Sequence, residues 1–383
     1  MEHTYISEIH LKGYKSIKNT SVVFRSGLNI IIGVNGGGKT NLLEVLYNFS
    51  YNGYNHLFQN GGIKPKNLNA ILKYEGVSKK NMSISLDNKG KINTWEIDGK
   101  DMFVPNVFFD TSFIQSPEMS FPNIAYLRYG LPIFLETFSN PTNIELEIKP
   151  NIKEEDGDEC ININMEAWFK KQYALNYNRF IDNLIRTNIQ SEKQEHGIFE
   201  TNKKFISVLR QYTPVEDMEL DKSIFKSVPK NSNDDDPFSY KFEGVNYRFK
   251  VKNEWFSWND LSDGTKRILY IIGTIYYSWD SIILIEEPEL GIHPHQLRDL
   301  MQFIKIQAKN KQIILTTHSP QVLNVLNSDE LDRIIIAEMS ENNTTLRHLD
   351  KKQQSNARKY MATELSLGDY WTSADLEPQN MML

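Results

Sequence analysis

The chain has 383 residues, 40% of them hydrophobic, and a formal net charge of −6. This length exceeds that of a typical single domain and predicts two lobes, or one domain with an insertion. The acidic balance argues against a dedicated nucleic-acid binder, although a local basic stripe is compatible with it. Cys160 is the only cysteine, which excludes a disulfide framework and a cysteine-rich zinc site.

The N-terminal sequence and the apolar runs predict where the protein works. The opening MEHTYISEIHLKGYKS lacks the charged and then apolar layout of a signal peptide. No apolar run approaches the roughly 20 residues that a helix needs to cross a membrane. We therefore expect a cytoplasmic protein that has no membrane partner.

The N-terminal third predicts strands around one helix. β-Branched residues broken by glycine predict strands within 4–17 and 20–33, and a helix follows over 40–48. Residues 82–99 alternate apolar and polar side chains around Asn-Lys-Gly and Asp-Gly turns, which is typical of antiparallel hairpins. A further strand is expected within 104–114.

The middle of the chain, about residues 121–253, differs in character. Residues 165–189 have helical periodicity, and their aromatic residues suit the core of a small helical lobe, a contact surface for a partner, or both. The acidic stretches 153–159 and 229–237 are rich in turn-forming residues. We interpret these stretches as solvated loops rather than metal sites.

Short apolar strands return after residue 254, at 281–287, 311–318 and 332–339. They alternate with helical stretches, the pattern of a parallel sheet that is covered by helices.

The segment Gly33–Thr40, GVNGGGKT, matches the phosphate-binding pattern G-x-x-x-x-G-K-[ST] between a predicted strand and a predicted helix. The glycines allow the backbone to approach phosphates, and the start of the helix adds its positive dipole end. Lys39 is expected to reach the β- and γ-phosphates, and the Thr40 hydroxyl to bind Mg²⁺. The other loop residues expected at the nucleotide are Asn35, Gly36, Gly37 and Gly38. A plain glycine turn is disfavoured, because both the spacing and the flanking elements agree.

Two carboxylates end the apolar strand in residues 281–294, SIILIEEPELGIHP. Glu286 is placed to approach Mg²⁺, and Glu287 is placed to orient and polarise the attacking water. The alternative is a strand that is followed by acidic residues without a catalytic role. The phosphate-binding loop earlier in the chain argues against this alternative.

Two shorter signals flank this strand. Residues 261–264, LSDG, form a polar turn at the start of a predicted helix, which is another anion-binding arrangement. The strand in 313–323 ends at His318. A single histidine is usually structural, but one at the tip of a parallel strand beside a phosphate-binding strand is expected to reach the γ-phosphate.

Four motifs, taken in chain order, resemble the ABC-type ATPase head: the phosphate-binding loop (P-loop) at 33–40, the LSDG turn at 261–264, which matches the family's signature, the strand that ends in two carboxylates, and His318. The opening 9–46 is similar to the heads of SMC, RecF and OLD (overcoming lysogenization defect) proteins. Residues 284–296 and 314–323 resemble most the OLD/RecF branch of AAA-type ATPases, and 365–376 resembles a tail of small defence-associated members.

The resemblance implies an α/β fold: an ABC-type ATPase head with a parallel or mixed P-loop sheet, an N-terminal antiparallel β subdomain and a mainly helical insertion. The expected domains are residues 1–120 and 254–383, which form the two parts of the head, and residues 121–253, which form the insertion.

The resemblance also implies a mechanism in which two heads bind head to tail around ATP. Ser262 and Gly264 would then contact the γ-phosphate of the other subunit. Lys15 and Ser16 match the position where SMC-like heads place an Arg-Ser pair that contacts nucleotide. His293 falls about where the family has its D-loop.

The family also uses a glutamine as a ligand of Mg²⁺, at a strand end between the P-loop and the signature. Gln115 is our choice and Gln59 the alternative. Three departures from the family stand out: Glu286 replaces the usual aspartate, the signature contains Asp263 instead of glycine, and no heptads predict a long coiled coil.

The residues after His318 lack the acidic constellation of a metal-dependent nuclease, so we do not expect this chain to cut nucleic acid. By analogy with two-gene antiphage systems such as Septu or PARIS, the first hypothesis is a sensor ATPase that controls a separate nuclease or toxin. The alternative is a RecF-like DNA-binding clamp for repair. Its candidate DNA contacts, which suit solvated hairpins equally well, are Lys64, Lys66, Lys79, Lys80, Lys89 and Lys91. A metabolic nucleoside-triphosphatase is disfavoured by the signature and His318.

Overall fold

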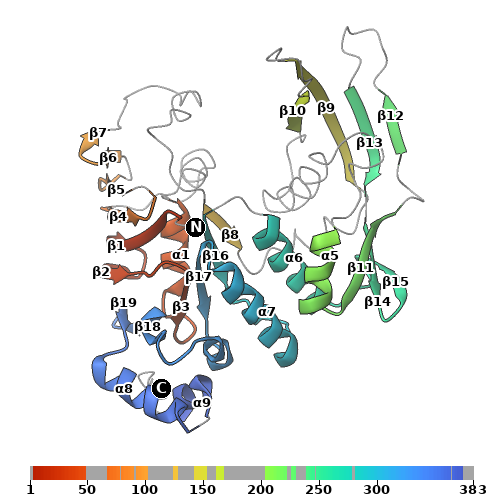
Figure 1. Cartoon of the computed structure of the whole chain (residues 1–383). Helices are drawn as coiled ribbons and strands as arrows, with labels where there is room; N and C mark the ends of the chain where they lie inside the picture. Colours follow the sequence, from red (N-terminus) through yellow and green to blue (C-terminus); the bar gives the residue numbers. More distant parts are fainter. Residues whose placement is uncertain are drawn as a thin grey trace. The chain divides into compact units, whose positions relative to one another are not determined.

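The computed structural model describes residues 3–48, 67–77, 79–89, 92–101, 124–127, 142–152, 161–167, 203–221, 226–229, 239–245, 247–277, 281–363 and 365–373. The chain divides into two compact units, residues 1–129 with 278–383, and residues 130–277. The second unit reaches beyond residue 253, the end that the sequence predicted for the insertion. Figure 1 labels the helices and strands of both units.

A six-stranded sheet forms the centre of the first unit, in the order β19-β18-β3-β17-β16-β8. Its strands are β3 (Leu28–Ile32), β8 (Ile124–Leu127), β16 (Ile282–Glu286), β17 (Gln312–Thr317), β18 (Ile334–Ser340) and β19 (Asn343–His348). All neighbours are parallel except β18 and β19. Every residue of β3, β16 and β17 is buried, as expected for strands covered on both faces. This mixed, mainly parallel sheet agrees with the α/β fold that the sequence predicted.

A second six-stranded sheet, entirely antiparallel, has the order β2-β1-β4-β5-β6-β7. Its strands are β1 (Tyr5–Tyr14), β2 (Ile17–Val23), β4 (Asn69–Glu75), β5 (Lys80–Leu86), β6 (Ile92–Ile97) and β7 (Lys100–Asp101). Buried residues alternate with exposed or partly buried residues along β4 and β5, so one face of this sheet is apolar. This is the predicted N-terminal antiparallel β subdomain.

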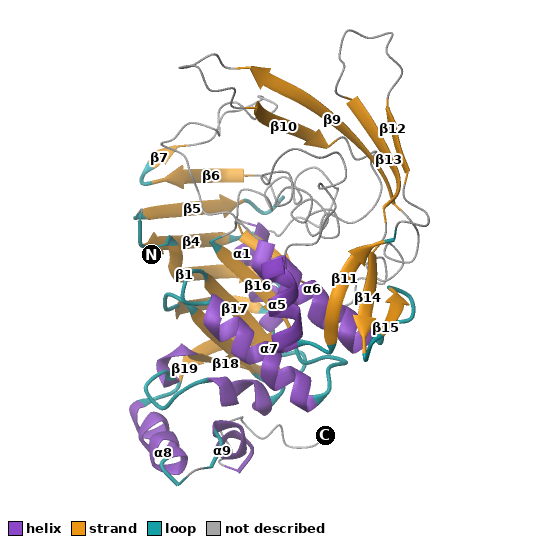
Figure 2. Cartoon of the chain, turned by 45° about the vertical axis from the view of Figure 1, so that its right-hand side comes forward, coloured by secondary structure: helices purple, strands orange, loops and turns teal. Residues whose placement is uncertain are grey.

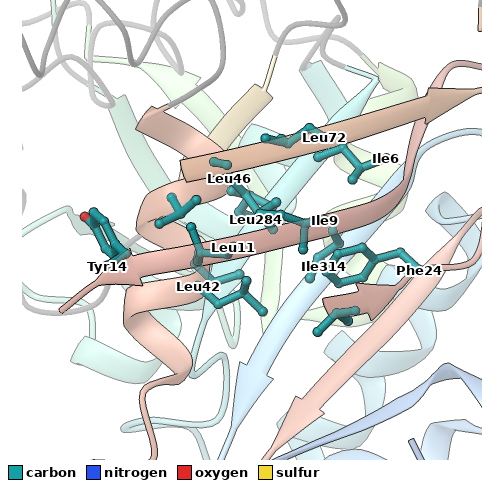
Figure 3. Packing of buried hydrophobic residues seen from close by; sticks show 14 of the residues in the cluster. Ile6, Ile9, Leu11, Tyr14, Phe24, Leu42, Leu46, Leu72, Leu284 and Ile314 are labelled. Carbon is teal, nitrogen blue, oxygen red and sulfur yellow. The ribbon is translucent and has the colours of Figure 1, made fainter. Parts of the chain in front are cut away.

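The apolar face of the antiparallel sheet closes over the central sheet and helix α1 (Lys39–Asn48). Figure 3 shows Ile9 and Leu11 of β1 beside Leu42 of α1 and Leu284 of β16, and all four belong to one buried cluster. Burial of this kind stabilises by about 25 cal/mol per Å² of apolar surface. It therefore fixes the loop before α1 relative to the ends of the central strands.

One buried polar side chain connects the two sheets. Gln312, the first residue of β17, is fully buried. Its Oε1 accepts from Ile6 N at 2.8 Å, while its Nε2 donates to Ile6 O at 2.8 Å and to Arg25 O at 3.1 Å. The amide thus hydrogen-bonds backbone groups of β1 and of the segment after β2 in the buried space between the sheets.

The described part of the first unit also contains α7 (Pro294–Gln307), the 3₁₀ turns η4 (Pro320–Val325) and η5 (Leu331–Arg333), α8 (Lys351–Met361) and α9 (Leu367–Ser373). Helix α9 lies next to α8 (Figure 2). The ring centroids of Tyr360 in α8 and Tyr370 in α9 are 5.2 Å apart. Gly368 N donates to Asn324 Oδ1 at 2.7 Å, so α9 also packs on the turn that follows His318. No helix in the described residues is both long and apolar enough to cross a membrane.

The second unit contains two antiparallel sheets and two helices in its described part. One sheet has the order β10-β9-β13-β12, with β9 (Thr142–Ile152), β10 (Ile161–Ala167), β12 (Lys226–Pro229) and β13 (Ser239–Val245). The other has the order β11-β14-β15, with β11 (Val215–Leu220), β14 (Tyr247–Val251) and β15 (Glu254–Ser257). The helices are α5 (Lys203–Tyr212) and α6 (Asp263–Tyr277).

We expected a mainly helical insertion; in the part of this unit that the structure describes, strands outnumber helices. Apolar residues alternate along β10, at Ile161, Ile163, Met165 and Ala167, which is the strand period rather than the helical one. Three residues of the segment with helical periodicity, 165–167, lie in β10, and the rest of 165–189 lies outside the described residues.

Candidate active site

The phosphate-binding segment connects β3 to α1, the strand–turn–helix context that its pattern requires. Gly36 and Gly38 have φ angles of +78° and +85°, which favour glycine. A Cβ at Gly36 would meet nothing within 4 Å, whereas one at Gly38 would lie 2.1 Å from Thr344 Oγ1 of β19. The loop therefore presents an open backbone on one side and packs tightly against β19 on the other.

Lys39 begins α1 and is only 5% exposed. Its Nζ donates to Gly33 O at 2.7 Å and to Val34 O at 3.0 Å. Asn35 and Gly36, at the tip of the loop, are exposed. The ammonium thus lies under an exposed glycine turn at a helix N-terminus, a geometry that fits an incoming phosphate chain.

Thr40 and Glu286 approach each other from α1 and the end of β16. Thr40 Oγ1 donates to Glu286 Oε1, and the Glu286 carboxylate is 8% exposed. Tyr126 of β8 donates to Glu286 Oε2 at 3.5 Å. A hydroxyl and a carboxylate are oxygen ligands that suit Mg²⁺, which commonly takes one or two carboxylates together with substrate phosphates and water. The pair therefore fits the ion; nothing in the sequence pointed to Tyr126.

Glu287 and His318 meet at the same edge of the sheet. Register pairs Glu286 with Thr316 on parallel strands, so the next residues of both strands leave the sheet together. Glu287 N donates to Thr316 O at 2.9 Å, and Glu287 has a φ of +44°, a costly value for a residue with a side chain. His318 Nδ1 lies 3.5 Å from Glu287 Oε1.

A third carboxylate, which the sequence analysis did not single out, belongs to this cluster. Glu289 is 9% exposed, and its Oε1 accepts from Thr317 Oγ1 at 2.6 Å and from His318 N at 3.1 Å. Its position in the sequence could have indicated this role, since Glu289 lies two residues after Glu287, in the turn that crosses the tip of β17.

Lys15 and Ser16, expected at the nucleotide, lie beside α1. Lys15 has a φ of +49°, and its Nζ pairs with Glu44 of α1. Ser16 Oγ accepts from Asn41 Nδ2 at 2.8 Å and lies 2.7 Å from Thr344 Oγ1. The turn between β1 and β2 is thereby attached to both α1 and β19.

The signature residues begin α6, in the second unit. Ser262 is exposed, and its Oγ accepts from Thr265 N at 3.2 Å, which satisfies one of the free N–H groups at the start of the helix. Gly264 is buried in the first turn. Asp263, the departure from the family signature, lies 3.6 Å from Lys266, which partly offsets the added negative charge.

The remaining candidates are Gln115, Gln59 and His293. Gln115 and Gln59 lie outside the described residues. β16 pairs in parallel with β17 and with β8, and β8 ends at Leu127. His293 caps α7, where its Nδ1 accepts from His295 N at 3.4 Å.

The central sheet, the loop around Lys39 and the carboxylates at the end of β16 define a P-loop ATPase of the ABC type. The family model described as "AAA ATPase domain" matches residues 5–204, and the chain belongs to this family. A second model, "AAA domain, putative AbiEii toxin, Type IV TA system", matches residues 170–324.

Individual relatives and a solved structure agree with this assignment. The chain is 23% identical to the retron Ec83 probable ATPase of Escherichia coli, with 85% of this chain and 70% of the relative covered. It is also 23% identical to the Septu protein PtuA of Bacillus thuringiensis, with 85% and 74% covered. The structure of an SmcHead bound to the C-winged helix domain of ScpA matches with a TM-score of 0.56 at 16% identity, over 91% of this chain and 99% of that chain. The fold is therefore that of an SMC head.

Proposed function

We propose that the chain hydrolyses ATP to control a separate effector, a nuclease or a toxin, in antiphage defence. One observation carries the hydrolysis: Glu286 and Glu287, at the tip of β16, meet Thr40 and His318 at one edge of the sheet. Similarity to the Septu protein PtuA and to a retron ATPase supports the defence role.

In the proposed reaction, the oxygen of a water attacks the γ-phosphorus of ATP while the bond to the β,γ-bridging oxygen breaks, which gives ADP and phosphate. Lys39 Nζ exchanges the carbonyls of Gly33 and Val34 for β- and γ-phosphate oxygens. Glu287 orients the water and accepts its proton. Thr40 and Glu286 would hold Mg²⁺, which when bound neutralises charge on the phosphate oxygens.

Head-to-tail dimerisation completes this proposal. Ser262 N-caps α6, so the exposed start of the helix offers N–H groups and a positive dipole end to an anion. In the dimer this turn contacts the γ-phosphate held by the other copy. ATP then joins two heads, and hydrolysis separates them.

Light scattering of the purified protein tests this function together with an ATPase assay. We expect Mg²⁺-dependent release of phosphate, and a non-hydrolysable ATP analogue should at least double the mass. A chain that releases no phosphate, or that stays monomeric with the analogue, contradicts the proposal. Salt-sensitive binding of duplex DNA by the chain alone would instead favour the RecF-like clamp.

The effector itself is proposed to contact the second unit, since this part of the chain interrupts the head. Exposed positions on α5 include Lys203, Lys204, Ser207 and Arg210. Exchange of these residues is expected to weaken effector binding and to leave ATP binding intact. If an effector remains bound to such a variant at wild-type affinity, this surface is not the contact.

A further inference from the structure

Glu289 is a buried carboxylate that has no role in the ATPase reaction described above. Its side chain is 7% exposed, and burial of a charge is costly unless hydrogen bonds compensate for it. Two donors supply that compensation at Oε1, the Thr317 hydroxyl at 2.6 Å and His318 N–H at 3.1 Å. Both donors belong to the tip of β17, so Glu289 holds the end of the strand that carries His318.

The same oxygen also faces the imidazole ring. Glu289 Oε1 lies 3.5 Å from His318 Nδ1, at the same distance as Glu287 Oε1. Neither contact is a hydrogen bond in this structure, since Nδ1 is buried and has no hydrogen-bond partner among the described residues. Both neighbours are carboxylate oxygens, however, so their negative charge favours the tautomer that has its proton on Nδ1. Nε2 is then the ring nitrogen that remains for another partner.

The second oxygen of Glu289 has a different environment. Oε2 is buried and has no hydrogen-bond partner among the described residues. The carboxylate therefore points Oε1, which accepts two hydrogen bonds, toward the His318 ring. Its other oxygen, Oε2, makes no hydrogen bond with the described residues. A glutamine could keep both hydrogen bonds through its own Oε1, but it would face the ring without the negative charge that favours a proton on Nδ1.

We propose that Glu289 is a positioning residue for ATP hydrolysis, which holds His318 at the tip of β17 with a proton on Nδ1 and leaves Nε2 for the γ-phosphate. The inference rests on the proposed function. This role also accounts for the two carboxylates beside one histidine. Because Glu289 orients the His318 ring, Glu287 can turn toward the attacking water while the ring keeps its position.

Nitrogen-15 NMR of the histidine rings in the nucleotide-free protein tests the tautomer independently of activity. The His318 signals are identified by their loss in a His318→Gln variant. We expect the Nδ1-protonated tautomer in the wild type and a mixture with the Nε2-protonated form in Glu289→Gln. Identical tautomer populations in both proteins would overturn the inference.

Kinetics provide the second readout. Glu289→Gln is expected to lower kcat by about 10- to 100-fold, the range typical when a side chain that orients a functional histidine is lost. KM and ATP affinity should change less than about 2-fold, because the P-loop contacts of Lys39 remain. Unchanged kcat would overturn the inference. Glu330→Gln, the same chemical change in an ion pair outside the cluster, should leave kcat and the His318 tautomer unaltered.

Thr317→Val is the second variant for the NMR experiment, to be used if Glu289→Gln does not fold. Thr317 is fully buried, and the substitution removes one donor that orients Glu289 while it nearly conserves volume. It should shift the tautomer of His318 in the same direction as Glu289→Gln, and no shift would count against the inference. A wild-type protein without ATPase activity would refute the proposed function alone, since the tautomer measurement needs no nucleotide.

Discussion

The buried ammonium of Lys39 satisfies two carbonyls of its own loop, and these contacts prepare it for a phosphate chain. Lys39→Ala removes a charged donor, whose hydrogen bonds are each worth about 1.5–3 kcal/mol. We expect ATP affinity to fall by about 10- to 100-fold in calorimetry, because 1.4 kcal/mol corresponds to tenfold. Lys12→Ala, at an exposed position of β1, is the control and should bind ATP normally. Unchanged affinity of Lys39→Ala would refute the P-loop assignment.

Glu287 is the carboxylate that we assign to the attacking water. Glu287→Gln preserves the shape of the side chain and leaves Thr40 and Glu286 in place, so ATP affinity should persist. The rate of phosphate release should fall by about 10²- to 10⁴-fold, the usual contribution of a general acid–base group. Single-turnover kinetics with saturating ATP measure this step. Hydrolysis at the wild-type rate would show that another group activates the water.

At the scale of elements, Gln312 joins β17 to β1. Gln312→Leu removes the hydrogen bonds that the N–H and C=O of Ile6 form with the buried amide, and a buried group that loses its partner costs about 1–3 kcal/mol. The free energy of unfolding in urea should therefore fall by about 2–4 kcal/mol. Gln302→Leu, at an exposed position of α7, should change it by less than about 0.5 kcal/mol. Equal effects of the two changes would contradict the proposal that Gln312 connects the two sheets.

A second connection joins α7 to the loop before β18. Lys305 Nζ donates to Val325 O at 2.7 Å and to Glu330 Oε2 at 2.6 Å. Burial raises the pKa of the Glu330 carboxyl, but hydrogen bonds from Lys305 Nζ and Asn327 N outweigh burial and hold the pKa below its ordinary value of 4.5. A carboxyl with a lowered pKa stabilises the fold above its unfolded-state pKa, and this contribution is lost as the pH falls through the folded-state pKa.

Glu330→Gln tests this connection through the pH dependence of stability. At neutral pH the variant should be about 1–2 kcal/mol less stable than the wild type, since a charged hydrogen bond is lost from a partly exposed pair. The difference should shrink as the pH falls below 4.5, where the wild-type carboxyl becomes protonated. Urea unfolding measured over that pH range reports it. A difference that is independent of pH would contradict the assignment.

At the scale of the whole molecule, function depends on the proposed pairing of two heads. Ser262→Arg adds a bulky cation at the exposed start of α6. ATP should still bind to the P-loop, but the ATP-dependent increase in mass should disappear from light scattering, together with most of the turnover. Ser207→Arg, an exposed change on α5 of the same unit, should assemble normally. Normal assembly and turnover of Ser262→Arg would refute the two-headed arrangement.

Motifs whose residues are neighbours in the chain could be predicted well from sequence. The loop around Lys39 is a strand, a glycine turn and a helix in succession, so its geometry follows from local backbone preferences. The apolar runs that end at Glu286 and at His318 likewise predict parallel strands, whose tips meet at one sheet edge. For the same reason the antiparallel subdomain was predictable, since its alternation has the strand period.

Contacts between residues far apart in the chain could not be predicted in this way. Tyr126 reaches Glu286 because β8 pairs with β16, and Gln312 reaches Ile6 because the two sheets face each other. Glu289 becomes a partner of His318 because the turn after β16 crosses the tip of β17. The side chains that can hold a nucleotide are encoded locally, whereas the groups that orient them depend on strand order and burial, which arise when the whole chain packs.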